Sequence, residues 1–431
     1  MSDPSILERR NALLGEKAPI FYNEPVHLVR GEGVWLYGPN GEKYLDAYNN
    51  VPAVGHCHPH VVDALTKQAS TLNVHTRYLS EVILDYGERL VGTMDESLNR
   101  PFFVCTGTEA NELAIRIARE TTGEMGIIGT NNTYHGNSNT VMQLAYGRLK
   151  PKKRPHSPNF RYVPYPQLYR PPAPMSEAAL AQAYAAEIQV AIDDFKKHNV
   201  KFAGILVCPI FANEGVPDVP AGYFELMEQI VHDAGGVIIF DEVQSGFGRT
   251  GAMWAYEATG IVPDILTMGK PMGNGHPLAA TVTTEKLANK FQDNQRYFNT
   301  FGGNPVSCAV GDAVLDVIED EALLDRVNSV SAYLREGLEM LQKDFEIIGD
   351  IRNVGMFFAI EMVKDRFKKK PAKNAENRIV NGIKSKGVLL SSIGPEGNIL
   401  KIRPPLTFTT EHADIVLEKL TECLVEMASE T

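Results

Sequence analysis

The sequence has few cysteines, no long apolar run and no excess of positive charge, and each lack excludes a class of protein. Five cysteines without paired spacing among 431 residues are typical of reduced thiols in a cytosolic protein, not of a disulfide-bonded secreted one. The longest apolar run, residues 202–212, is too short to cross a bilayer. Residues 1–17 lack the apolar segment of a signal peptide. We therefore expect a cytoplasmic protein that does not enter a membrane.

Charge and composition narrow the class further. The net charge of −11 disfavours binding to a phosphate backbone or to an anionic lipid surface, so we expect no nucleic-acid partner. Hydrophobic residues make up 44% and charged residues 22%, which is ordinary for a globular protein and excludes disorder and coiled coil. The length predicts two or three domains with a sizeable core.

An alternation of strand and helix patterns begins near residue 78. Apolar runs of strand length are separated by segments whose apolar residues lie three and four apart, which is the spacing of a helix. This alternation predicts an α/β domain around a mostly parallel sheet. The predicted strands are 102–105, 125–129, 203–208, 236–240 and 264–268, and the predicted helices are 108–119, 177–197 and 223–234.

The pattern changes near residue 314, where longer helices are interleaved with strands and predict a smaller α+β domain. The predicted helices are 321–343, 372–386 and 411–427, and the predicted strands are 357–362, 388–391 and 399–403. A β-hairpin is expected at 34–45, with Asn40 and Gly41 in its turn, and is expected to join this smaller domain. The expected division is 1–75 as an N-terminal segment of the small domain, 76–313 as the large domain and 314–431 as the C-terminal small domain.

Polar residues follow three of the predicted strands, at the edge where open α/β sheets bind ligands. Gly107 and Thr108 begin a helix, where N–H groups beside a hydroxyl suit a phosphate, although Thr108 is also a good N-cap. Asp241 ends an apolar strand, and a carboxylate there needs a cation such as a protonated pyridine nitrogen, or else serves as a cap or in an ion pair. Lys270, among small residues, is either a nucleophilic amine or an ordinary surface lysine. Together, an anion cradle, an acid and a lysine meet the requirements of pyridoxal 5′-phosphate (PLP).

Several ordered sequence blocks resemble one family. Residues 240–251 (FDEVQSGFGRTG), followed by Gly269 and Lys270, are similar to the signature of the class III, fold type I, PLP-dependent aminotransferases. Residues 55–59, 134–136 and 299–305 are further family-like blocks, and the resemblance extends from about residue 29 to residue 420. It implies PLP as the cofactor and the α/β architecture of fold type I, with a mostly parallel seven-stranded sheet in the large domain and a smaller α+β domain.

The resemblance also implies a role for each matching residue. Lys270 would hold the cofactor as a Schiff base and move the proton at the substrate Cα, and Asp241 would pair with the ring nitrogen. The other implied contacts are Tyr134 and Val243 on the two ring faces, Gln244 with the ring hydroxyl, Gly107 and Thr108 with the phosphate, His135 behind these residues, and Thr300 with the phosphate of a neighbouring subunit. Thr300 thereby implies a homodimer with shared active sites, and a tetramer is left open.

The chain departs from the family pattern after the strand predicted at 203–208. Cys208 and Asn213 stand where many members carry two glutamates, and Glu214 lies one position away from the second. The family's glutamate switch, which lets one site alternate between two amino donors, therefore lacks its usual residues here.

A second departure concerns the substrate anion. Many members read Arg-Ile-Ala-Pro-Pro near the C-terminus, and residues 401–405 read Lys-Ile-Arg-Pro-Pro here. Residues two apart share a strand face, so Lys401 and Arg403 are both expected to face the substrate. The anion is a carboxylate, a phosphate or a phosphonate, and either side chain is a candidate for its clamp. Tyr48 is expected to line the same substrate site.

Two activities and one non-enzymatic role compete. The first expectation is an aminotransferase that moves an amino group from an amine or amino acid to a 2-oxo acid such as pyruvate, with Arg403 on the acceptor carboxylate. The second is a PLP-dependent lyase that eliminates phosphate or ammonia from an amino-phosphate, an aminophosphonate or a similar substrate. Several stretches look most like the branch with ethanolamine-phosphate phospho-lyase and related bacterial aminotransferases and lyases. A regulator of this fold is disfavoured because every catalytic position is filled.

No metal site is expected. The run His56-Cys57-His58-Pro59-His60 offers ligand atoms, but no second ligand group lies at a matching spacing, and the simpler interpretation is a turn that leads into a helix. The glycine pairs at 31–33 and 246–248 lack the strand, the helix and the third glycine of a dinucleotide site.

Overall fold

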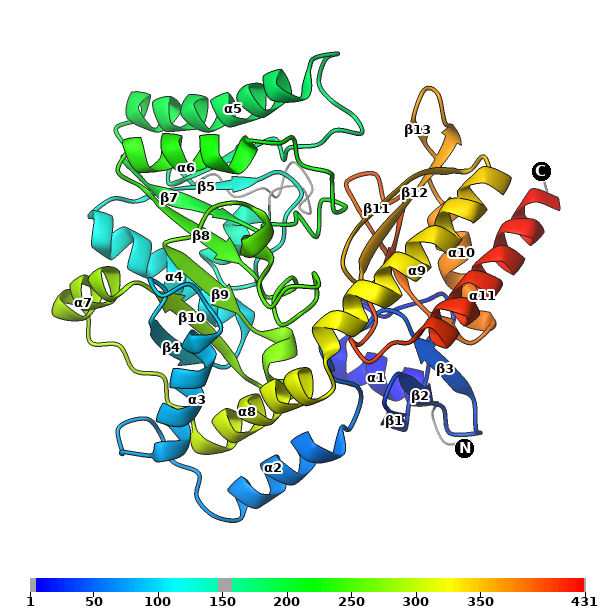
Figure 1. Ribbon diagram of the computed structural model, residues 1–431, viewed down its shortest axis with the longest axis horizontal. Helices are drawn as coiled ribbons and strands as arrows, with labels where there is room; N and C mark the ends of the chain where they lie inside the picture. The colour runs from blue at the N-terminus through cyan, green and yellow to red at the C-terminus, as the bar shows by residue number, and fades with distance from the viewer. Residues whose placement is uncertain (1–4, 146–156, 430–431) are drawn as a thin grey trace.

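A seven-stranded sheet forms the centre of the larger of two lobes (Figure 1). In sheet order its strands are β4 (Arg100–Val104), β10 (Ala279–Thr283), β9 (Ile265–Met268), β8 (Val237–Asp241), β7 (Phe202–Val207), β5 (Gly126–Thr130) and β6 (Phe160–Val163). The structure, a computed structural model, describes residues 5–145 and 157–429. Strand β10 pairs antiparallel with both β4 and β9, and the pairs from β9 to β6 are all parallel. The mostly parallel sheet predicted from the sequence is therefore confirmed.

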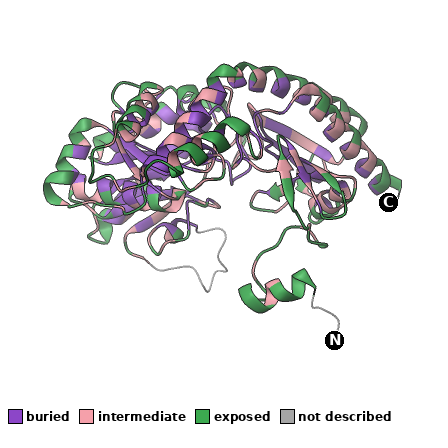
Figure 2. Ribbon diagram, turned by 90° about the horizontal axis from the view of Figure 1, so that it is seen from below, coloured by how far each residue is buried: buried purple, intermediate pink, exposed green. Residues whose placement is uncertain are grey.

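Helices cover both faces of this sheet, because successive residues of a strand point to opposite faces. Ile239 packs in one apolar cluster with α4 (Gly107–Thr122). Ile238 and Phe240 pack in another cluster with α5 (Glu177–Lys197) and α6 (Tyr223–Asp233). With both faces covered, the central strands are buried along their length and appear purple in Figure 2. This explains why their sequences are continuously apolar rather than alternating.

Helix α4 begins at Gly107 because Thr106 caps it. The Thr106 hydroxyl accepts the Glu109 N–H at 3.1 Å, and the Glu109 carboxylate accepts the Thr106 N–H at 2.9 Å, which completes a capping box. The interpretation of Thr108 as the N-cap is wrong, because Thr108 already lies inside the first turn. Its hydroxyl is therefore not used to cap the helix.

Two smaller sheets form the second lobe, in the orders β1-β2-β3-β14 and β11-β12-β16-β15, with β13 paired to β12. Their strands are β1 (Arg30–Glu32), β2 (Trp35–Tyr37), β3 (Lys43–Asp46), β11 (Ile348–Val354), β12 (Phe357–Asp365), β13 (Lys370–Pro371), β14 (Val388–Leu389), β15 (Ser391–Ile393) and β16 (Ile399–Ile402). Leu45 pairs in parallel with Val388, so the N-terminal hairpin lies against a C-terminal strand. The boundaries of the domains stay a prediction.

The remaining helices cover the outer surfaces and connect the lobes. They are α1 (Ile6–Leu14), α2 (Pro59–Ala69), α3 (Glu81–Gly92), α7 (Glu285–Asn294), α8 (Pro305–Asp320), α9 (Leu323–Asp344), α10 (Ala375–Ser385), α11 (Thr410–Ser429) and the 3₁₀ helices η1 (Val141–Leu144), η4 (Ala255–Ala258) and η5 (Lys270–Gly273). Helix α9 begins two residues later than predicted, because Ala322 adopts a φ of 49° and separates it from α8. Helix α1 stands apart from the body and buries none of its residues (Figure 2).

No helix within residues 5–145 and 157–429 is long and apolar enough to cross a membrane.

Candidate active site

One cavity collects most of the residues that the sequence placed at a cofactor. Strands β4, β8 and β9 run in the same direction, so they end at one edge of the sheet. A cavity of about 130 Å³ at this edge is lined by Thr106, Gly107, Thr108, Tyr134, His135, Gly136, Asp241, Val243, Gln244 and Lys270. Thr300 is not among them.

Asp241 is the buried acid of this cavity. It is the last residue of β8 and points to the same face as Ile239, which is the face that α4 covers. Its Oδ2 lies 2.6 Å from Nδ1 of His135 and accepts the side-chain N–H of Asn111 at 2.9 Å. Its Oδ1 accepts the N–H of Val243 at 3.0 Å.

These donors keep Asp241 charged. Burial alone would raise the pKa of the carboxyl, but the hydrogen bond and charge of His135, together with the Val243 N–H, outweigh burial and lower this pKa below its usual range. The cavity therefore contains a fixed negative charge, which suits a protonated nitrogen.

Glu242, the next residue, serves a different purpose. Because strand side chains alternate, it points to the opposite face and reaches the start of η4. Its two oxygens accept the N–H groups of Ala255 at 2.7 Å and Tyr256 at 2.8 Å. Burial raises the pKa of Glu242 to about 8, yet both oxygens act as acceptors, so we assign it a structural role as a cap.

Sequence reasoning missed Asn111. Its amide nitrogen also donates to the His135 carbonyl at 2.7 Å, and its oxygen accepts from the Thr267 hydroxyl at 2.7 Å. Asn111 therefore connects α4, β9 and the acid at the end of β8. A signal was available, because Asn111 lies three and seven residues before Ala114 and Ala118 on the buried stripe of the helix.

Lys270 follows β9 and begins η5, half-buried beside the same cavity. Burial, opposed by the charge of Asp241 and aided by that of Arg403, lowers the pKa of its amine from 10.5 to about 8. A lysine with this pKa is neutral in a large fraction of molecules near pH 8 and is then a nucleophile and a base.

Two glycines allow the backbone to close in around the cavity. A Cβ on Gly107 would lie 2.8 Å from a methyl carbon of Val243, and a Cβ on Gly136 would lie 2.8 Å from the Thr108 hydroxyl. Gly136 also has a φ of 146°, which residues with a side chain rarely adopt. The start of α4 thus presents N–H groups and a hydroxyl to the cavity, an arrangement that suits a phosphate.

The residues at the two glutamate positions of the family make local contacts. Asn213 donates its side-chain N–H to the Tyr134 carbonyl at 3.3 Å, and Cys208 is buried. Glu214 is buried as well and accepts from the Thr130 hydroxyl at 2.6 Å. Burial raises the pKa of Glu214. None of the three forms a bond to Arg403 in the described chain.

Lys401 and Arg403 are both buried, and both lie over one ring. The Nζ of Lys401 is 5.1 Å and the Cζ of Arg403 is 5.0 Å from the ring centre of Tyr48. Arg403 also donates to the Gln244 side-chain oxygen and, at 3.2 Å, to the Tyr48 carbonyl. The structure therefore brings Tyr48, both cations and Gln244 together at one border of the site.

Asp46, which the sequence did not single out, holds the Tyr48 segment. Its Oδ1 accepts the N–H groups of Tyr48 at 3.0 Å and Asn49 at 2.9 Å. Its Oδ2 accepts the Asn49 side chain at 3.0 Å and lies 2.7 Å from Nε2 of His56. This buried carboxylate thereby fixes the turn that carries Tyr48.

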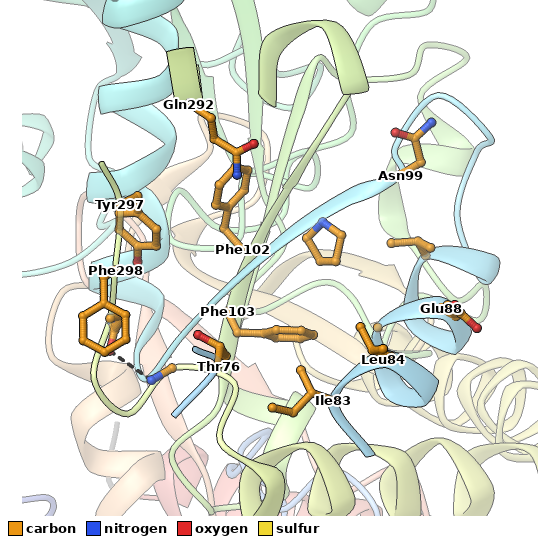
Figure 3. Close-up of a pocket in the computed structure, with 15 residues that line it drawn as sticks. Thr76, Ile83, Leu84, Glu88, Asn99, Phe102, Phe103, Gln292, Tyr297 and Phe298 are labelled. Carbon is orange, nitrogen blue, oxygen red and sulfur yellow. Dashed lines mark hydrogen bonds between the residues drawn. The ribbon is translucent and has the colours of Figure 1, made fainter. Parts of the chain in front are cut away.

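Thr300 lies on an exposed loop near a different and larger cavity. That cavity, of about 460 Å³, lies between α3 and the segment around Phe298. Figure 3 shows Leu84 and Glu88 from α3 on one side, Tyr297 and Phe298 on the other, and Phe103 between them. The cavity contains none of the titratable groups of the Lys270 site.

The histidines of residues 56–60 contact separate carboxylates. His58 Nε2 is 3.1 Å from Glu321, and His60 Nε2 is 2.7 Å from Asp316. In residues 5–145 and 157–429 no three His, Cys, Asp or Glu side chains are grouped so that they could bind a metal ion.

Comparisons with known proteins converge on one family. The sequence profile described as aminotransferase class-III matches residues 20–424. The chain is 38% identical to alanine–glyoxylate aminotransferase 2-like of Drosophila melanogaster, over 100% of this chain and 89% of that protein. It is 37% identical to ethanolamine-phosphate phospho-lyase homolog 1 of Caenorhabditis elegans, over 97% and 92%. The solved structure of a phospholyase from Arthrobacter in complex with phosphoethanolamine superposes with a TM-score of 0.94, at 40% identity over 98% and 99%.

We expect Lys270 to titrate near pH 8 in protein freed of any bound cofactor, because burial and Arg403 disfavour its charged form. Only the neutral amine reacts with acetic anhydride, so acetylation of Lys270 should rise with pH and level off above about pH 8, whereas an ordinary lysine continues to gain reactivity up to about pH 10.4. Pulse labelling and peptide mass mapping at a series of pH values measure this, with the exposed Lys290 as the internal reference. A common profile for both lysines would contradict the lowered pKa.

Proposed function

The chain belongs to the class-III aminotransferases, PLP-dependent enzymes of fold type I, and we propose that it eliminates phosphate from a small amine that carries a phosphate group. The family, the fold type and the cofactor that the sequence implied are confirmed. The activity within the family is the proposal, and it changes the order of the two activities expected from sequence.

The residues around the Lys270 cavity fit PLP. An ionised acid, an amine with a lowered pKa and the start of α4 face one space, which matches a ring nitrogen, an aldehyde and a phosphate. When bound, the cofactor supplies an electron-withdrawing ring that stabilises negative charge on the carbon next to the substrate nitrogen. In the proposal the contacts are Lys270 with the aldehyde carbon, Asp241 with the ring nitrogen, Gln244 with the ring hydroxyl, Tyr134 and Val243 with the ring faces, Gly107 and Thr108 with the phosphate, and His135 with Asp241.

The substrate class rests on one observation, the pair of buried cations over Tyr48. Lys401 and Arg403 are 7% and 5% exposed, and no carboxylate of the described residues forms an ion pair with Arg403. A buried guanidinium without a carboxylate partner is unfavourable until an anion joins it, and Lys401 beside Arg403 adds positive charge that attracts the same anion. A phosphate carries close to two negative charges near neutral pH and a carboxylate only one, so the pair matches a phosphate or phosphonate better.

The contacts of Asn213 and Glu214 favour elimination over amino exchange. An aminotransferase must accept two different substrates in turn, and a glutamate partner that covers the arginine for one of them serves that purpose. Here Asn213 bonds the Tyr134 backbone and Glu214 bonds Thr130, so Arg403 keeps its charge available for every substrate. A site in which no glutamate neutralises Arg403 favours an anionic substrate in every cycle, and this suits an enzyme with one anionic substrate.

Lys270 is the base in this proposal. Its Nζ takes the proton from the substrate carbon that bears the nitrogen, the bond between the neighbouring carbon and the phosphate oxygen breaks, and phosphate leaves with the bonding pair. The unsaturated amine that remains takes up water to give an aldehyde and ammonia. One water is thus consumed for each phosphate and ammonia released. Lys401 and Arg403 stabilise the charge on the departing phosphate.

Amino transfer to a 2-oxo acid is the second candidate. The relative from Drosophila melanogaster, 38% identical along the whole chain, is named an aminotransferase. Arg403 alone offers the forked donor that a carboxylate needs. In this case Lys270 would move the same proton, and the amino group would stay with the enzyme until an oxo acid removed it.

We also propose that two copies of the chain pair through the face that carries Thr300. Leu79 is 99% and Phe301 71% exposed, and both lie close in sequence to residues that line the 460 Å³ cavity of Figure 3. Large exposed apolar side chains beside an open cavity are typical of a surface that a partner covers. A second copy with the same surface would bring Thr300 of one subunit toward the phosphate site of the other.

The pairing of such dimers into tetramers is left open. The cytoplasmic location stays a prediction. The relatives include proteins named as mitochondrial from Arabidopsis thaliana and Homo sapiens.

With ethanolamine phosphate as the sole substrate, the holoenzyme should release phosphate and ammonia over many turnovers without any oxo acid. Elimination regenerates the enzyme in every cycle, whereas amino transfer stops after one equivalent when no acceptor is present. Phosphate, ammonia and aldehyde are counted per active site over time. One equivalent of aldehyde without free phosphate or ammonia, with further aldehyde only after pyruvate is added, would favour the aminotransferase.

Loss of Arg403 should weaken binding of the anion selectively. In Arg403→Ala, KM for the phosphate-bearing amine should rise about ten- to a hundredfold, the value of a charge-assisted bond, while the Kd of the holoenzyme for ethylamine, which carries no anionic group, changes little. The matched variant Lys401→Met should raise KM for a phosphate more than for a carboxylate, because it removes the second charge. Equal losses of affinity for the amine with the phosphate and the amine without it would mean that Arg403 supports the fold instead.

Mixed dimers test whether the site is shared. Lys270→Ala and Thr300→Ala, each weak alone, are co-expressed with different tags. If Thr300 serves the other subunit, every mixed dimer contains one intact site, and total activity should recover to about a quarter of wild type in a random mixture. If Thr300 serves its own subunit, the mixed dimers stay as weak as their parents.

A further inference from the structure

Arg249 is a buried arginine outside the Lys270 cavity that the proposed reaction does not use. It lies in the loop after β8, at 2% exposure, among the largest fully buried side chains of the described chain. Its Nη1 donates to the Pro404 carbonyl at 2.6 Å and to the Met356 carbonyl at 3.1 Å. No described carboxylate forms an ion pair with it.

The Pro404 carbonyl matters because it belongs to the residue after Arg403. Prolines 404 and 405 have no N–H, so this segment has few ways to bond its surroundings. The Arg403 N–H donates to the Ala47 carbonyl at 2.8 Å, and the Leu406 N–H donates to the Ala53 carbonyl at 2.7 Å. Between these two anchors, Arg249 is the donor that fixes the backbone from which the Arg403 side chain extends.

The contact with Met356 is reciprocal and tight. The Met356 N–H donates to the Arg249 carbonyl at 3.0 Å. Gly355 has a φ of 52°, and a Cβ there would lie 2.5 Å from the same carbonyl oxygen. The loop of the larger lobe therefore lies directly on the chain of the smaller lobe, where Arg249 bonds both Met356 and Pro404.

A neutral donor could bond the carbonyls of Pro404 and Met356, so these hydrogen bonds alone do not explain why a charged residue is buried at position 249. Burial, aided by the charge of Arg403 and opposed by that of Asp46, lowers the pKa of Arg249 to about 9. Two guanidinium groups are thus buried near each other, with Lys401 on the same side as Arg403. Two buried guanidinium groups, neither of them in an ion pair with a described carboxylate, are unfavourable in the free protein, and an anion that binds beside them relieves this cost.

We infer that Arg249 is a positioning residue for the substrate anion, because it fixes the backbone that aims Arg403 and adds positive charge behind it. This inference rests on the proposed role of Arg403 as the anion clamp. Arg249 itself does not touch the substrate.

Three variants separate this role from a general contact between the lobes. Arg249→Met keeps the length and removes the charge and both hydrogen bonds, and Arg249→Lys keeps the charge with a shorter reach. The control is Arg352→Lys, since Arg352 also bonds across the lobes, to the Gly215 carbonyl at 3.2 Å, and pairs with Glu361 at 2.9 Å. Each holoenzyme is assayed for inhibition by inorganic phosphate, for its Kd for ethylamine, which carries no anionic group, and for its melting temperature.

In Arg249→Met, we expect the inhibition constant of phosphate to rise about tenfold while the Kd for ethylamine stays within about twofold, because misplacing one charged group by a fraction of an ångström has effects of this size. Arg249→Lys should recover part of the affinity. Arg352→Lys should lower the melting temperature without changing phosphate affinity. If Arg249→Met does not fold, Arg249→Lys and Arg249→Gln provide the same comparison.

Three results would overturn the inference. Unchanged phosphate affinity in the folded Arg249 variants would remove the positioning role while leaving the proposed function in place. Equal loss of phosphate affinity in Arg352→Lys would assign the effect to contact between the lobes. If Arg403→Ala binds phosphate as tightly as the wild type, the anion clamp itself is wrong, and the inference fails with it for that separate reason.

Discussion

The buried charge of Asp241 is the constraint on which the rest of the site depends. A carboxylate inside a covered sheet is stable only where donors surround it, and here they come from α4, from the loop that carries His135 and from the backbone of Val243. Each donor fixes one element. Asn111 sets the rotation of α4 above the sheet, and that rotation presents Gly107 and Thr108 at the cavity. Lys270, at the end of the neighbouring strand, then faces the same charge.

Local patterns in the sequence were sufficient for most of the large lobe. Continuous apolar runs identified β5, β7, β8 and β9, and the three-and-four spacing identified α4, α5 and α6, because these periods follow directly from backbone geometry. The strand β10 and the break between α8 and α9 could not be read in this way. β10 is a short run that fills a gap between strands distant in sequence, and the break depends on the unusual φ of Ala322.

The site residues also fall into two groups, those that local sequence patterns predict and those that they do not. Asp241, Lys270 and the start of α4 stand at strand ends and could be predicted, since strand direction alone brings them together. The contacts of Asp46 and Arg249 could not be predicted. Both side chains bond backbone groups, and because the backbone is the same for nearly all residue types, the sequence does not indicate which residues are their partners. These hidden contacts cluster at the anion side, where Tyr48 and Arg403 of the smaller lobe meet Gln244 of the larger one. In the proposed function, the residues that would hold the cofactor thus lie on one lobe, and those that would select the substrate lie at the junction of the two lobes.

The neighbours Asp241 and Glu242 differ in purpose only because a strand alternates its faces. The Asp241 side chain points toward α4 and the cavity, and the Glu242 side chain points toward η4 and caps its first N–H groups. An inserted or deleted residue anywhere in β8 would turn both side chains around together, placing the acid of the cavity in the apolar core and the cap in the cavity. The strand can therefore exchange one apolar side chain for another but cannot change its length, and the loop after it is constrained separately by the contacts of Gln244 and Arg249.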